Sequence, residues 1–111
     1  MPAASSASRR TARRSRVDKL IVTHRGALQA KYGARMAEID KAMKALIASD
    51  AKRGLTTRVV ALDDAKALAA AKGRAVVRAN DERATKRAID ALYRHFAPDY
   101  LVILGASDVV P

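Results

Sequence analysis

The stretch that decides the fold of this chain is VDKLIVTH, residues 17–24. Its centre, Leu20-Ile21-Val22, is a continuous run of β-prone residues without alternation between apolar and polar positions. A short run of this kind is typical of a strand buried on both faces, as in a parallel sheet covered by helices. The Arg25-Gly26 pair that follows marks the end of this predicted strand.

The residues after this strand change to a helical period. Between about residues 27 and 53, large apolar side chains recur every three or four positions, which predicts one long amphipathic helix. Gly33 falls inside it and weakens it by about 1 kcal/mol relative to Ala, which the long stripe can outweigh. The charged residues of this segment, Asp50 included, are interpreted as a solvated helix face. The apolar stripe consists of Leu28, Tyr32, Met36, Ile39, Met43 and Leu46.

The remaining sequence predicts two more strands and two more helices. A second strand covers residues 56–62, and Asp63 and Asp64 provide an N-cap for a short helix at about 65–72. Residues 74–78 are predicted as a connector, a helix runs from about 82 to 96, and YLVIL at 100–104 is the last strand. This β-α-β-α-α-β order predicts an α/β fold with a three-stranded parallel sheet in order 2-1-3. With helices on both faces, it forms half of a doubly wound sheet.

The composition limits the possible functions. The 111 residues include 22 Lys plus Arg and 11 Asp plus Glu, which gives a net charge of +11, and no cysteine. A chain without cysteine has no disulfide, no thiolate metal site and no cysteine nucleophile. No apolar run approaches the roughly 18 residues of a membrane helix, and no metal-ligand spacing or phosphate-binding loop is present. We therefore expect no membrane contact, no metal and no cofactor, and a cytoplasmic location.

Much of the charge lies in the first sixteen residues, which carry five arginines and no acidic residue. Because this tail has no large apolar residue after Met1, we predict that residues 1–16 are disordered and that residues 17–111 form a single domain. Three interpretations of the tail remain open: contact with nucleic acid or another polyanion, an organelle transit peptide, or a solubilising extension. The candidate polyanion contacts are Arg9, Arg10, Arg13, Arg14 and Arg16.

The last predicted strand is followed by few residues, and these end in the apolar Val109-Val110-Pro111. A three-stranded parallel sheet of this kind exposes apolar surface and an open edge. We therefore expect the domain 17–111 to be incomplete at its C-terminus. Its expected partner is the remainder of its own domain or a second copy of the chain.

The segment APDYLVILG at residues 97–105, followed by ASDVVP at 106–111, resembles a segment of the gingipain-type cysteine peptidases, which belong to the caspase-like fold group. In that family a strand similar to PDYLLLVGD ends in Gly, passes through a small-residue and acidic turn, and reaches an apolar-Pro pair. The strand at Leu20-Ile21-Val22, the long helix and the strand at Val59-Val60 also suit the opening of such a domain. Ala106 departs from the pattern, because many relatives have an acidic residue there.

The resemblance implies a fold and an ancestry. Members of the family are similar to His/Cys-dyad peptidases whose catalytic residues lie on later strands, so no dyad residue carries over to this chain. The resemblance thus implies a non-catalytic N-terminal α/β fragment of a gingipain-like protein. The alternative is a small basic binding module that contacts nucleic acid or another polyanion through its arginine-rich tail.

A ligand site in an open α/β sheet lies beyond the carboxyl ends of the strands. The candidates at this rim are His24 and Arg25 after the first strand and Ser107 and Asp108 after the third. A Ser/His/Asp arrangement is formally possible there, but Ser107 lacks the Gly-x-Ser-x-Gly turn of such hydrolases. No catalytic residue is therefore assigned.

Overall fold

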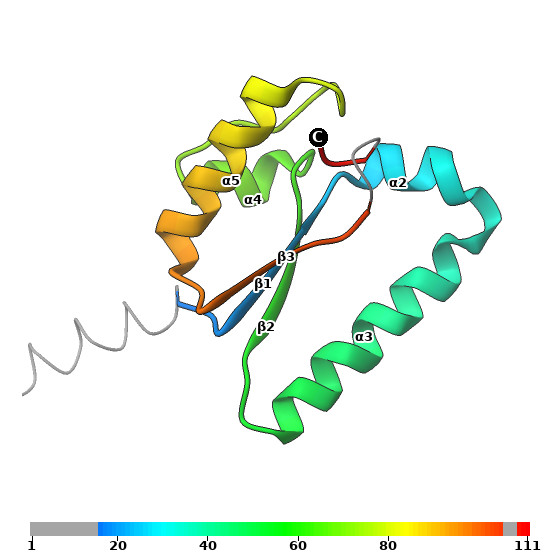
Figure 1. Ribbon diagram of the computed structural model, residues 1–111, viewed down its shortest axis with the longest axis vertical. Helices are drawn as coiled ribbons and strands as arrows, with labels where there is room; N and C mark the ends of the chain where they lie inside the picture. The colour runs from blue at the N-terminus through cyan, green and yellow to red at the C-terminus, as the bar shows by residue number, and fades with distance from the viewer. Residues whose placement is uncertain (1–15, 106–108) are drawn as a thin grey trace, which may run out of the picture.

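The structure of the protein, a computed structural model, describes residues 16–105 and 109–111. Its three strands lie in the order β2-β1-β3, and the central strand pairs with both neighbours in parallel. Helices cover both sides of the sheet (Figure 1), which confirms the predicted α/β fold and strand order. The elements are β1 (Lys19–Thr23), α2 (Arg25–Tyr32), the 3-10 helix η1 (Gly33–Arg35), α3 (Met36–Lys52), β2 (Thr57–Ala61), α4 (Ala65–Ala70), α5 (Glu82–Phe96) and β3 (Tyr100–Ile103).

Strand β1 lies at the centre because its side chains are apolar on both faces. Leu20, Ile21 and Val22 are each at most 2 % exposed. Leu20 is in register with Arg58 of β2, whose guanidinium lies 5.5 Å from the centre of the Phe96 ring on α5. Since side chains alternate along a strand, Leu20 and Val22 face α5, whereas Ile21 faces α3.

The predicted single helix over 27–53 is wrong, because it is broken at Gly33. This residue has φ 51° and ψ −116°, a conformation that glycine adopts at little cost, and it ends α2. A 3-10 turn follows, and α3 begins at Met36 in a new direction (Figure 1). Tyr32, Ile39, Met43 and Leu46 of the predicted apolar stripe are only partly buried.

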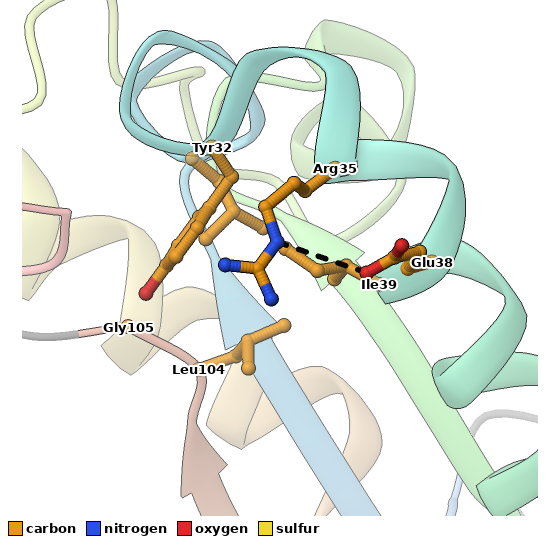
Figure 2. A pocket seen from close by; sticks show the side chains of 7 residues that line it. Tyr32, Arg35, Glu38, Ile39, Leu104 and Gly105 are labelled. Carbon is orange, nitrogen blue, oxygen red and sulfur yellow. Dashed lines mark ion pairs between the residues drawn. The ribbon is translucent and has the colours of Figure 1, made fainter.

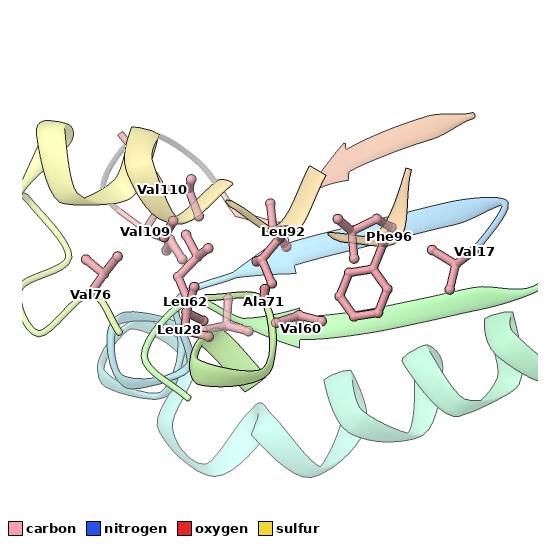
Figure 3. Packing of buried hydrophobic residues seen from close by; sticks show 14 of the residues in the cluster. Val17, Leu28, Val60, Leu62, Ala71, Val76, Leu92, Phe96, Val109 and Val110 are labelled. Carbon is pink, nitrogen blue, oxygen red and sulfur yellow. The ribbon is translucent and has the colours of Figure 1, made fainter. Parts of the chain in front are cut away.

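The main core lies between the sheet and the layer formed by α4 and α5 (Figure 3). Leu62, Leu68 and Leu92 are almost completely buried there, and Val109 and Val110 return to the same core. Gly105 permits this return, because its φ is +112° and a Cβ on it would lie 2.7 Å from the Cβ of Val109. The final valine pair is therefore buried in the protein's own core and adds no exposed apolar surface.

Candidate functional site

His24 follows the central strand at the predicted rim, but its ring is buried and fully hydrogen-bonded. Its Nε2 lies 2.9 Å from the carbonyl oxygen of Val76, and its Nδ1 accepts a hydrogen bond from the backbone N–H of Ala27 at 3.1 Å. This pattern assigns the proton of the neutral ring to Nε2, which donates to Val76. His24 therefore acts as the N-cap of α2.

These contacts do not support His24 as a catalytic base. Both ring nitrogens already have backbone partners, so neither is available to take a proton from a hydroxyl at the rim. The carboxylate of Asp63 lies 3.8 Å from Nδ1, beyond hydrogen-bond distance. The two other residues of the formal Ser/His/Asp arrangement, Ser107 and Asp108, lie outside the described residues.

Arg25 is also committed to the protein's own structure. Its guanidinium donates two parallel hydrogen bonds to the carboxylate of Asp40 on α3, each 2.8 Å long. The hydrogen bonds from Arg25 hold the pKa of the Asp40 carboxyl below its usual value. The pair joins the start of α2 to α3, and Arg25 is thus not a free anion-binding group.

Asp63, at the carboxyl end of β2, was predicted to cap the helix that follows it. Its carboxylate instead accepts hydrogen bonds from the backbone N–H groups of Arg25 and Gly26, both at 2.9 Å. Asp64 alone caps α4, where it accepts from Lys66 and Ala67. Asp63 therefore caps α2, a helix nearly forty residues earlier in the chain.

Two apolar cavities lie beside this rim, between the sheet and the α2–α3 layer. One has a volume of about 260 Å³ and the other of about 370 Å³, and Leu28, Ile39 and Leu104 line both. Figure 2 shows Tyr32 extending toward Gly105 and Arg35 extending toward Leu104 in the smaller cavity. Polar groups at these two cavities are paired with each other: Arg25 with Asp40 at the larger cavity, and Arg35 with Glu38 at the smaller one.

Of the predicted polyanion contacts, only Arg16 can be placed. Its guanidinium lies 3.0 Å from the carboxylate of Asp99, so its charge is partly offset within the domain. The other four, Arg9, Arg10, Arg13 and Arg14, lie outside the described residues.

Asp50 was interpreted as part of a solvated face, and this is wrong, because it is completely buried. It accepts hydrogen bonds from the hydroxyl of Thr57 at 2.6 Å, from the ammonium of Lys19 at 3.0 Å, and from Arg53. These bonds, that of Thr57 first, lower the pKa of Asp50 to about 2. Asp50 lies four residues after Leu46, and this spacing on the apolar stripe was the signal for its burial.

Strand β3 presents the longest run of exposed large apolar side chains among residues 16–105 and 109–111. Its four residues Tyr100, Leu101, Val102 and Ile103 are between 38 % and 62 % exposed. Since neighbouring side chains point to opposite faces, β3 is uncovered on both faces of the sheet. One of its edges pairs with β1, and no other described strand pairs with the second edge.

Comparisons with family models, curated proteins and solved structures found no match for this chain. Within residues 16–105 and 109–111, no helix has both the length and the apolar character needed to cross a membrane. The same residues contain no group of three or more histidine and acidic side chains placed to hold a metal ion.

Proposed function

We propose that this chain is the non-catalytic opening portion of a gingipain-like, caspase-fold domain, and that β3 is the strand to which the rest of that sheet is added. The exposure of β3 on both faces carries this proposal. Edge strands of soluble proteins are usually protected by charge, proline or a covering element, and β3 has four consecutive large apolar residues. We also propose that the protein is located in the cytoplasm, as expected from the sequence.

A further strand beside β3, with helices packed over it, accounts for all of these features together. It pairs with the open edge, while its covering helices bury Tyr100 and Val102 on one face and Leu101 and Ile103 on the other. The residues that resemble the gingipain-type segment form β3 itself, so the resemblance and the exposed surface coincide. A second copy of the chain is the alternative occupant of this edge.

The proposal predicts that the isolated chain self-associates or binds a hydrophobic dye through β3. Val102→Lys places a charge on the exposed strand and should reduce both effects. Val77→Lys is the matched control, because Val77 is 88 % exposed in the connector before α5 and lies outside the sheet. Light scattering and dye fluorescence measure the two effects.

A wild-type chain that binds no dye and melts sharply as a monomer contradicts the docking role of β3. Equal changes in light scattering and dye fluorescence for Val102→Lys and Val77→Lys contradict it as well.

The proposed peptidase ancestry has separate tests. The purified chain should release no product from peptides that are cleaved after Arg or Lys, and turnover that survives the removal of contaminants would reject a non-catalytic role. A coding frame that continues past residue 111 to a His-Gly pair and a later Cys supports the peptidase ancestry, and an immediate stop codon counts against it.

A further inference from the structure

A second surface, on the opposite side of the sheet from α3, is strongly basic. The connector after α4 closes onto α5 at Gly73, where an added Cβ would lie 3.0 Å from the Cβ of Ala91. A groove of about 420 Å³ remains beside this contact. Its charged lining consists of Lys72 and Arg74 from the connector and Arg87 and Arg94 from α5. We call these four residues the basic groove.

The basic groove lacks the carboxylates that accompany five other basic residues of the described chain. Arg16, Lys19, Arg25, Arg35 and Arg53 each form an ion pair with an acidic side chain. Among the residues that the structure describes, no carboxylate lies within ion-pair distance of any of the four groove cations, and none lines the groove. Four like charges around one hollow repel one another, and a bound anion relieves that repulsion.

An adjoining cavity of about 270 Å³ extends the groove along α5. It shares Lys72 and Arg94 with the groove and adds His95, again without an acidic residue. The segment 65–97, which contains all of these residues, has eight basic and three acidic side chains. The positive charge of the folded domain is therefore concentrated on this side.

The spacing of the cations favours an extended anion over a single phosphate. Arg87 and Arg94 are seven residues apart on α5, which is about 10.5 Å along the helix axis. A nucleic acid strand has one phosphate per about 3.4 Å of axis, so this distance spans about three phosphates. No Phe, Tyr or Trp side chain lines the groove, so bases have no ring on which to stack.

We propose that the basic groove binds the phosphodiester backbone of a nucleic acid duplex, without selecting base sequence. A groove of about 420 Å³ can admit one phosphodiester strand of a duplex between its four cations, whereas a flat lipid surface cannot enter it. The groove is also lined by Gly73, Ala84 and Ala91, whose small size lets the phosphodiester backbone approach closely. This site lies in the folded domain and is distinct from the arginine-rich tail.

The test is the binding of a fluorescently labelled 20-base-pair duplex of random sequence to the full chain, measured by anisotropy over a range of salt concentrations. The double variant Arg87→Gln/Arg94→Gln should weaken binding by about tenfold or more at moderate salt, and should reduce the slope of log K against log salt by about two. Arg87→Lys/Arg94→Lys keeps the charges and should retain most of the affinity, since phosphate contacts need charge more than geometry.

The matched control is Arg35→Gln/Lys41→Gln, which removes the same charge from exposed positions on the other side of the sheet. This control variant should retain most of the affinity for the duplex, and its slope of log K against log salt should match that of the wild type. Thermal melts check that each variant is folded. We expect all of them to fold, because the substituted side chains are exposed.

The proposal would be overturned if the wild type did not bind the duplex, or if the groove and control variants lost equal affinity for it. It would also be overturned if duplex affinity fell only when residues 1–15 were deleted. Displacement of the duplex by inorganic phosphate at equal phosphate concentration would likewise reject an extended anion. Binding to anionic phospholipid vesicles without binding to the duplex would also overturn the proposal, in favour of a membrane surface.

Discussion

Asp50 shows how one buried carboxylate joins three elements of this fold. It extends from the end of α3 to Lys19 in β1 and to Thr57 in β2, and its own backbone carbonyl accepts a hydrogen bond from Leu55. A buried charge is tolerated only when it is paired and hydrogen-bonded. The arrangement thus sets the distance between the end of α3 and the sheet.

We expect the stability of the protein to fall in acid because of Asp50. Its folded pKa of about 2 lies below the value of about 3.9 for an unfolded aspartate. Folding therefore favours the deprotonated form, and this contribution is complete above pH of about 4 and is lost as the pH falls toward 2. The difference in free energy of unfolding between wild type and Asp50→Asn, measured in denaturant, should be largest above pH 4 and should shrink toward pH 2.

Glu38→Gln is the control for this titration, because Glu38 forms only an exposed pair with Arg35 at 3.7 Å. Its effect should be small at every pH, as expected for surface ion pairs. A difference between wild type and Asp50→Asn that stays constant from pH 6 to pH 2 would show that the Asp50 charge does not stabilise the fold.

At the scale of elements, two adjacent aspartates cap two different helices. Asp64 caps the helix that follows it, as its position next to an alanine-rich segment predicts. Asp63 caps α2 because β1 and β2 are parallel neighbours, so the end of β2 lies beside the start of α2. Local spacing identifies the first cap, but the second depends on strand pairing.

Asp63→Ala should destabilise the protein more than Asp64→Ala. Removing Asp63 leaves two backbone N–H groups of α2 without their carboxylate partner, with an expected loss of about 1–2 kcal/mol. Asp64 caps the six-residue α4 at an exposed position, with longer bonds of 3.1 and 3.3 Å, and its loss should be about 0.5–1 kcal/mol. Denaturant unfolding of both variants measures the difference, and a larger effect at position 64 would reject this assignment.

The whole molecule has two distinct surfaces on one small domain. The apolar strand β3 lies at one edge of the sheet, and the basic groove lies on the α5 side. The backbone N–H groups of Tyr100 and Leu104 donate to carbonyls at either end of β1, so those of Leu101 and Ile103 face the open edge. The edge is thus open both to a strand and to water.

Hydrogen exchange should distinguish these strands in dilute solution. The amides of Leu101 and Ile103 should exchange fast, as expected at an open edge, whereas those of residues 20–22 in the buried β1 should exchange only through larger opening. Leu104, whose N–H donates to Val22 at 2.9 Å, is the internal control on the same segment. Raising the protein concentration should protect Leu101 and Ile103 if a second copy pairs with β3, and equal protection of β1 and β3 in dilute solution contradicts an open edge.

The sequence alone was sufficient for the fold class and the limits of α5, because these depend on periodicity and capping over short distances. The strand order followed from the order of the elements and the right-handed crossovers of β-α-β units. It did not reveal the break at Gly33, since the apolar stripe continues across that glycine and only the path of the backbone shows the change of direction. It placed Asp50 in solvent, because charge counts carry no information on which side chains face each other. The buried carboxylate, the cap from Asp63 and the basic groove each join residues that are distant in the sequence, so only the packing of strands and helices brings them together.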